Sequence, residues 1–207
     1  MKVVVFGSRG RIGQLVVEQA LAAGHQVTAV VRGASPFVDD DRLRILKADV
    51  RDPASVRHAV KGHDVVISAI GHASPREVNG LYSTAARNYV DAMSACDVKR
   101  LIAVSAWVGE STARTGFVFR TLIRPLVFEQ VFSDLEAAEA IYRTTSLDWT
   151  AVRPGRLTMG ARTGRFRIGL DLQGNVFSKI SRADVADFIV GQIEDPRWIK
   201  ASPELVY

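Results

Sequence analysis

Short runs of apolar, often β-branched residues alternate along this chain with longer segments in which apolar residues recur every three or four positions. The short runs favour β-strands, and the longer spacing favours amphipathic helices. The pattern predicts six strands, at residues 2–6, 26–32, 44–50, 64–71, 100–107 and 148–155. It predicts helices at residues 11–24, 53–62, 81–98 and 133–146, and a capped segment at 178–195.

Polar residues typical of helix starts support three of these segments. Asp52 precedes a proline, and an acidic N-cap before a proline at the first helical position favours a helix. Ser133 and Glu136 have the spacing of a capping box, in which each side chain bonds the backbone N–H of the other residue. Ser181 and Asp184 have a similar cap-like spacing, which we interpret as structural.

The order of the predicted elements indicates the fold class. Mostly apolar strands that alternate with helices indicate a parallel sheet with helices on both faces. We therefore expect an α/β, doubly wound (Rossmann-type) fold. Nothing in the 207 residues marks a second domain, so residues 1–207 are expected to form a single domain. The 47% apolar and 24% charged residues are ordinary globular usage and argue against disorder.

The remaining composition limits the partners. The chain lacks the apolar run of roughly 18 residues that a transmembrane helix needs, and it starts on a predicted strand without a signal-like segment. We expect a cytoplasmic monomer or homodimer with no membrane partner. One cysteine, Cys96, excludes an internal disulfide. The four histidines show no metal-ligand spacing, so no metal is expected.

The formal net charge of +5 raises the question of nucleic acid. The lysines and arginines are dispersed, however, and no nucleic-acid-binding module is recognisable, so no nucleic-acid partner is expected. The excess positive charge is better explained by a phosphorylated small ligand.

A glycine-rich stretch, GSRGRIG, lies between the first predicted strand and the first helix, with Gly7, Gly10 and Gly13 at every third position. Ligands of doubly wound sheets bind beyond the carboxyl ends of the strands. There, backbone N–H groups and the helix dipole favour an anion, and glycine removes the Cβ atoms that would hold a pyrophosphate away. In this position the motif predicts dinucleotide binding. The alternative is a glycine turn without a ligand.

Residues at the ends of the second, third and fourth predicted strands bear on the dinucleotide site and on the choice between NAD and NADP. Arg32 ends the second predicted strand, where a carboxylate would bind the ribose hydroxyls of NAD. A guanidinium there can pair with the 2′-phosphate of NADP, and Arg9 and Arg11 add to the same field. NADP is therefore the expected cofactor, with a solvated Arg32 as the alternative. Asp49 and Val50 end the third strand, where a side-chain acceptor could read an adenine edge. Ala69, Ile70 and Gly71 end the fourth and should run along the middle of the cofactor.

Six motifs occur in order along the chain: GSRGRIG, ADV, ISAIG, ARNYVDAM, AVSAW and AVRPGRLT. In these motifs the chain resembles the NAD(P)H-binding, NmrA-like proteins of the atypical short-chain dehydrogenase/reductase group, which include biliverdin-IXβ reductase (flavin reductase). The resemblance runs from Lys2 to about Ile193. It implies a cofactor site made of Gly7, Ser8, Arg9, Gly10, Arg11, Ile12, Gly13, Arg32, Asp49, Val50, Ala69, Ile70, Gly71, Ser105, Pro154, Gly155, Arg156 and Leu157.

The chain departs from its relatives at the proton donor. No tyrosine is followed by a lysine four residues later, so the usual tyrosine–lysine pair of short-chain dehydrogenases is absent. Arg156 stands where biliverdin-IXβ reductase has a histidine, and an arginine cannot serve as the proton donor. By the resemblance, Ser105 stands at the active-site serine position. It would orient a carbonyl oxygen or the nicotinamide amide, unless it only caps a strand end. Ser105 and Arg156 are the candidate catalytic residues.

The segment at 108–128 is the least regular part of the chain and follows the fifth predicted strand. It mixes apolar aromatic residues with arginines, which suits a cover for a planar substrate, anionic in the case of a flavin mononucleotide or a tetrapyrrole. Trp107, Phe117 and Arg120 are the candidate substrate residues. The alternatives are a helix packed on its own domain and a core position for Trp107.

Three functions remain open from the sequence. The first is an NADPH-dependent reductase that transfers hydride to a small planar acceptor such as a flavin, a quinone or a related carbonyl compound. The second is an NmrA-like redox sensor that binds NADP(H) without turnover. The third is an epimerase, dehydratase or ketoreductase of secondary metabolism on the same fold.

Overall fold

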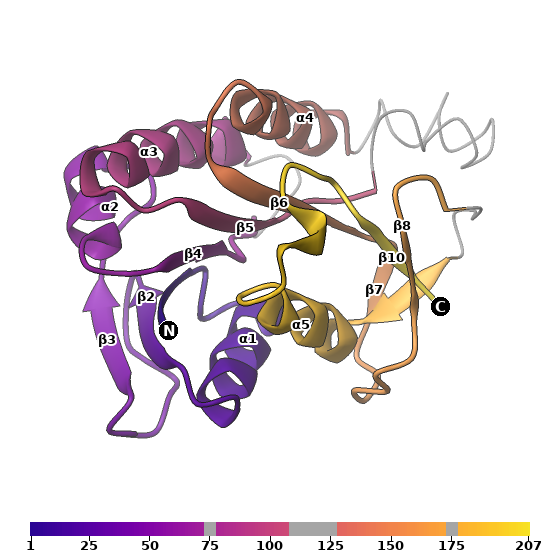
Figure 1. Cartoon of the computed structure of the whole chain (residues 1–207), viewed down its shortest axis with the longest axis horizontal. Coiled ribbons are helices and arrows are strands. Elements are labelled where there is room, and N and C mark those ends of the chain that lie inside the picture. The colour runs from indigo at the N-terminus through magenta and orange to yellow at the C-terminus, as the bar shows by residue number, and fades with distance from the viewer. Residues whose placement is uncertain (73–77, 108–127, 173–177) are drawn as a thin grey trace.

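The computed structural model describes residues 1–72, 78–107, 128–172 and 178–207. In these residues one eight-stranded sheet forms the middle layer of the molecule, with the strand order β3–β2–β1–β4–β5–β6–β10–β8 (Figure 1). The strands are β1 (Lys2–Phe6), β2 (Gln26–Val31), β3 (Leu43–Lys47), β4 (Val65–Ser68), β5 (Arg100–Val104), β6 (Asp148–Pro154), β8 (Arg167–Gly169) and β10 (Glu204–Val206).

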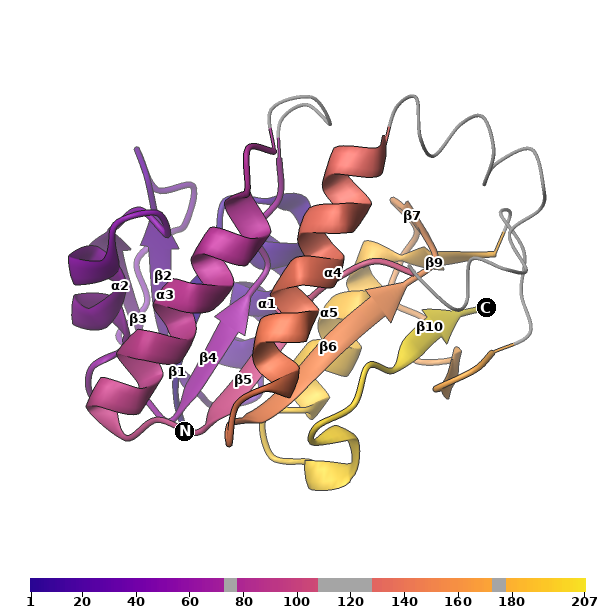
Figure 2. The same cartoon turned by 90° about the horizontal axis from the view of Figure 1, so that it is seen from above.

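Helices cover both faces of this sheet, as Figure 2 shows from above. One face carries α1 (Arg11–Ala22) and α5 (Arg182–Gly191), and the other carries α2 (Pro53–Val60), α3 (Leu81–Cys96) and α4 (Glu129–Arg143). All neighbouring strands of this sheet pair in parallel except β8, which is antiparallel to β10. All of β4 is buried because helices pack on both of its sides.

The doubly wound parallel fold expected from the sequence is therefore confirmed. The six predicted strands are all present, with ends that differ by a few residues from those predicted. Asp52 and Ser181 cap α2 and α5 as predicted, since their side chains accept hydrogen bonds from backbone N–H groups of the first turn. The short strands β7 (Arg156–Thr158), β8, β9 (Lys179–Ser181) and β10, and the 3-10 helix at Pro196–Trp198, were not predicted.

The predicted capping box at Ser133 and Glu136 is wrong. Helix α4 already begins at Glu129, so Ser133 lies inside the helix, and its hydroxyl donates to the carbonyl of Gln130. A serine within a helix commonly bonds a carbonyl of the preceding turn in this way.

The buried carboxylate of Asp184 joins the loop between β7 and β8 to the end of β9 and to the residue after β10. It accepts hydrogen bonds from the backbone and hydroxyl of Thr163, from Gly164 N–H, from Ser181 and from the Tyr207 hydroxyl, the last at 2.6 Å. Burial alone would raise the pKa of Asp184, but the hydrogen bonds from Tyr207, Gly164 and Thr163 outweigh it and lower the pKa to about 2. The ionised side chain therefore stabilises this part of the fold.

We expect Asp184→Asn to lower the free energy of unfolding at pH 7 by roughly 1–3 kcal/mol, since it leaves buried donors poorly satisfied. The folded-state pKa lies below the ordinary value of 3.8, so the contribution of the charge is present above about pH 4 and is lost as the pH falls toward 2. Urea denaturation of both proteins should therefore show a difference that shrinks over this range. The exposed Asp39→Asn is the control, and a difference independent of pH would contradict the prediction.

Candidate functional site

The glycine loop connects β1 to α1 and packs against the end of β4. Gly7 has a φ of +75°, and a Cβ on it would lie 2.4 Å from the carbonyl oxygen of Ala69. A Cβ on Gly13 would lie 2.2 Å from the carbonyl oxygen of Gly7. Real Cβ atoms do not approach backbone this closely, so both positions require glycine. Two of the three glycines are thus explained by the packing of the chain itself.

Gly10 is different, because it is the N-cap of α1 and its surroundings are more open. A Cβ there would meet the Gly7 carbonyl oxygen at 3.1 Å and the Ala69 carbonyl oxygen at 3.7 Å. Gly10 provides no capping side chain, and the first turn of α1 has no acidic residue. The backbone N–H groups at this helix start can therefore bind an anion, which suits the pyrophosphate of a dinucleotide.

The other residues of the loop divide between packing and binding. The Ser8 hydroxyl is buried and donates to the Val30 carbonyl at 2.7 Å, so this side chain fastens the loop to β2. Ile12 packs against the core that α1 and α5 share. Arg11 is exposed at the start of α1, and its charge adds to the effect of burial in lowering the pKa of Arg182. Of these residues, only Arg11 presents its side chain to solvent.

Two cations lie at the carboxyl end of β2. Arg32 is exposed directly after the strand. The guanidinium of Arg9 lies beside Gly33, with its Nη1 3.2 Å from the position of a Cβ on that glycine. The structure therefore brings the charge of Arg9 from the glycine loop to the end of β2, the place where the sequence predicts the 2′-phosphate of NADP.

The ends of β3 and β4 contribute mostly backbone. Asp49 is exposed, and its carboxylate accepts the N–H of Arg51. Val50 is buried, and its carbonyl accepts a hydrogen bond from the Asn88 amide at 2.7 Å, a contact that the sequence did not predict. After β4, Ala69 is buried, Ile70 is half-buried and Gly71 is exposed, which leads the chain out toward the site.

His72 follows at once and contacts a tyrosine of α3. Its Nδ1 lies 2.8 Å from the Tyr82 hydroxyl, and the two rings meet edge to face. Burial lowers the pKa of His72 and raises the pKa of Tyr82 to about 12. Among the described residues, no group of three or more histidine, cysteine, aspartate or glutamate side chains could hold a metal ion.

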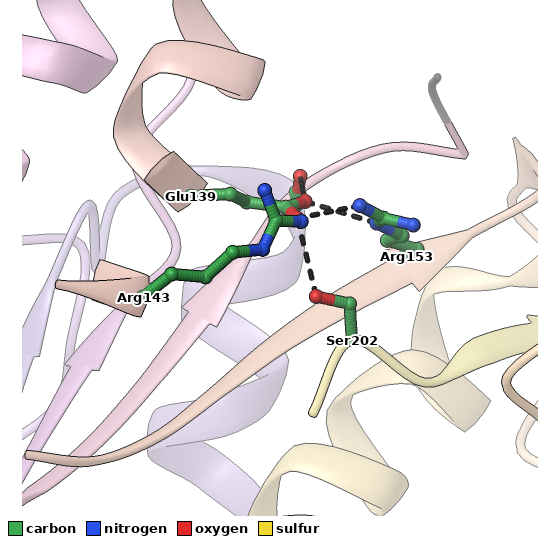
Figure 3. Close-up of polar contacts among 5 residues, drawn as sticks. Glu139, Arg143, Arg153 and Ser202 are labelled. Carbon is green, nitrogen blue, oxygen red and sulfur yellow. Dashed lines mark hydrogen bonds and ion pairs between the residues drawn. The ribbon is translucent and has the colours of Figure 1, made fainter. Parts of the chain in front are cut away.

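Ser105 belongs to a cluster around the buried Glu139 of α4. Figure 3 labels Glu139 and three of its other partners, Arg143, Arg153 and Ser202. The Ser105 hydroxyl donates to Glu139 Oε1 at 2.7 Å. Arg153 of β6 forms a forked pair with the same carboxylate, with Nε at 3.0 Å from Oε1 and Nη2 at 2.6 Å from Oε2. Arg143 and Ser202 also contact Oε2, at 2.9 and 3.1 Å. Glu139 is only 1% exposed.

The sequence reasoning missed Glu139, although a signal existed. Leu135 and Tyr142 lie on the buried face of α4, and Glu139 has the helical spacing of that face, four residues after the first and three before the second. A carboxylate within an apolar stripe must be paired when it is buried. Three of its partners, Ser105, Arg153 and Ser202, lie on other segments of the chain. Because these contacts depend on the folded structure, the sequence alone did not identify them.

The turn after β6 brings the second candidate catalytic residue to the surface. A Cβ on Gly155 would lie 2.7 Å from the Ser178 carbonyl oxygen, which explains the glycine after the buried Pro154. Arg156 donates its backbone N–H to that same carbonyl, and its side chain is exposed. Leu157 packs against the core under α5.

The candidate substrate residues are described only in part. Trp107 is 8% exposed, and its indole N–H has no hydrogen-bond partner among the described residues. Phe117, Arg120 and all of the segment at 108–128 except Phe128 lie outside the described residues. No helix in the described ranges has the length and apolar character needed to cross a membrane.

Comparison with known proteins identifies the ligand class of this chain. A family model described as NAD(P)H-binding matches residues 7–196, from the glycine loop to beyond α5. The chain belongs to this NAD(P)H-binding family. This match confirms a nicotinamide cofactor, in agreement with the dinucleotide binding that the glycine motif predicts.

Individual relatives agree with this assignment. The NAD(P)H-binding chain is 30% identical to YwnB of Bacillus subtilis over 206 residues, which cover 95% of this chain and 93% of YwnB. A crystal structure from Burkholderia pseudomallei has 32% identity and a TM-score of 0.80, with full coverage of both chains. ChuY, an anaerobillin reductase of Escherichia coli O157:H7, has 25% identity and a TM-score of 0.81, with 100% of this chain and 97% of ChuY covered. The resemblance to atypical short-chain dehydrogenases/reductases is confirmed.

We expect Gly10→Val to abolish cofactor binding while the protein stays folded. The branched side chain would fill the space over the first turn of α1 that the pyrophosphate needs. Titration of NADPH followed by calorimetry tests this, and thermal unfolding checks the fold. Gly191→Val, at a glycine whose Cβ would meet no atom within 4 Å, is the control. Unchanged NADPH affinity in Gly10→Val would show that the cofactor does not lie on this loop.

Proposed function

We propose that this protein is an NADPH-dependent reductase that transfers hydride to a planar acceptor such as a flavin, a quinone or a related carbonyl compound. When bound, the cofactor supplies the hydride, and the protein supplies binding and orientation. The observation that carries the proposal is the lack of a proton donor at the two candidate catalytic positions. Neither of the two candidate catalytic side chains, Ser105 and Arg156, is arranged as a proton donor to an acceptor.

The only O–H group of Ser105 donates its hydrogen bond to Glu139, and Arg156 is a permanently charged guanidinium. The tyrosine–lysine pair of other short-chain dehydrogenases is absent from the sequence. Flavins and quinones suit such a site, because they accept hydride when they are placed face to face with the nicotinamide and can take their protons from water. Arg156 at the surface can stabilise negative charge that develops on the acceptor.

The preference for NADPH over NADH is supported by Arg9 and Arg32 at the end of β2. Two guanidinium groups there can form charge-assisted hydrogen bonds with a 2′-phosphate, whereas NAD-binding proteins commonly have a carboxylate at this position. The anaerobillin reductase ChuY, at 25% identity over the whole chain, supports reduction as the reaction type.

We expect Arg32→Asp to erase or invert the cofactor preference. A charge-assisted contact contributes roughly 1.5–3 kcal/mol, so the unmodified protein should bind NADP about 10- to 150-fold more tightly than NAD. Calorimetric titration with both dinucleotides measures this ratio. Arg87→Asp, an equal charge change at an exposed position of α3, should leave the ratio as it is. Equal affinities of the unmodified protein for NADP and NAD would contradict the assignment.

The reaction itself is tested by mixing the purified protein with NADPH and a panel of acceptors, here flavin mononucleotide, menadione and a simple ketone. We expect the reduced-nicotinamide absorbance to fall with the flavin or the quinone and to stay constant with the ketone, since neither Ser105 nor Arg156 can supply the proton that an alkoxide needs. Gly10→Val is the inactive control. Tight NADPH binding without oxidation by any acceptor would favour the redox sensor instead.

A further inference from the structure

The direction of one hydrogen bond limits what Ser105 can do. A carboxylate has no proton to give, so in the 2.7 Å contact the Ser105 hydroxyl is the donor and Glu139 Oε1 is the acceptor. Serine has only one O–H proton. While this contact persists, Ser105 can offer a ligand only the lone pairs of its oxygen.

The Glu139 carboxylate is held so firmly that this direction is fixed. Oε1 accepts from Ser105 and from Arg153 Nε, and Oε2 accepts from Arg153 Nη2, Arg143 Nη2 and Ser202 Oγ. The side chain is 1% exposed. Its partners come from α4, β6, the end of β5 and the segment before β10, and Figure 3 labels those from α4, β6 and the segment before β10. A carboxylate that pairs with two guanidinium groups acts only as an acceptor.

Ser105 lies where the nicotinamide half of a dinucleotide would end. It follows β5 at the carboxyl edge of the sheet and lines a small cavity with Ile70, which follows β4. That cavity, of about 10 Å³, has room for about one water molecule and not for a substrate. The nicotinamide carries a carboxamide with N–H donors, whereas a substrate carbonyl carries only acceptors.

We propose that Glu139 is a positioning residue that fixes Ser105 as a hydrogen-bond acceptor for the carboxamide N–H of the nicotinamide. The sequence left open whether Ser105 orients a substrate carbonyl or the nicotinamide amide, and the hydrogen-bond direction selects the amide. This inference rests on the proposed function, because it needs the nicotinamide to lie at the ends of β4 and β5.

The test compares NADPH with its 3-acetylpyridine analogue, in which a methyl ketone replaces the carboxamide and no N–H donor remains. The unmodified protein should bind NADPH roughly 5- to 30-fold more tightly than the analogue, since the analogue leaves the Ser105 lone pairs unpaired. Ser105→Ala should bring the ratio of the two affinities close to one. Fluorescence titration gives both dissociation constants.

Glu139→Gln gives a sharper result. Oε2 has two cationic partners and Oε1 has one, so the oxygen of the introduced amide should take the position of Oε2. The NH₂ group of that amide should then face Ser105, and the hydrogen bond from Arg153 Nε is lost. The serine then accepts a hydrogen bond from this NH₂ group and directs its own proton to the ligand, so the preference should shift toward the acetyl analogue. Ser202→Ala removes a hydroxyl donor from Oε2 only and should change both affinities by the same factor, which keeps the ratio.

Each outcome decides a different claim. An unmodified protein that binds neither cofactor overturns the proposed function. Tight NADPH binding with the same preference in the unmodified protein and in Ser105→Ala overturns the inference alone. Ser105→Ala leaves the arginine pairs of Glu139 in place, so the inference stays testable even if Glu139→Gln does not fold.

Discussion

The close approach of the glycine loop to the end of β4 determines where everything else in the site lies. With the Cβ positions of Gly7 and Gly13 within 2.4 Å of backbone carbonyl oxygens, helix α1 starts directly against the sheet. That closeness aims the uncapped amides of α1 at the carboxyl edge and brings Arg9 across to the end of β2. A loop with larger residues would hold α1 away from β1 and would separate the anion cradle from the strand ends.

The sequence predicted what depends on local pattern. The six strands, the caps at Asp52 and Ser181, and the glycine loop follow from periodicity and from residue types at fixed spacing. The strands β7 to β10 are three residues long, which is too short for a periodic pattern to appear. Ser133 misled because a capping-box spacing can occur inside a helix, where only the tertiary packing of α4 defines the start.

The sequence allowed us to predict which loop and strand-end positions would form the candidate site. It did not allow us to predict the side-chain contacts of Glu139. Positions such as Gly7 and Ala69 could be assigned because the topology of a doubly wound sheet places strand ends together. The contacts of Glu139 could not, since Ser105 lies 34 residues before it and Ser202 lies 63 residues after it. Long-range polar contacts leave little trace in one sequence, although a carboxylate on an apolar helix face indicates that such partners exist.

The contact between Ser202 and Glu139 also has a consequence for the order in which the protein is made. The serine is synthesised 63 residues after the glutamate, a delay of roughly 3–13 s at ordinary translation rates. During that interval β5, β6 and α4 can meet, but the strand β10 that flanks β6 does not yet exist. The edge of β6 is then open to pairing with other chains, so the nascent protein is exposed to mispairing until β10 is added.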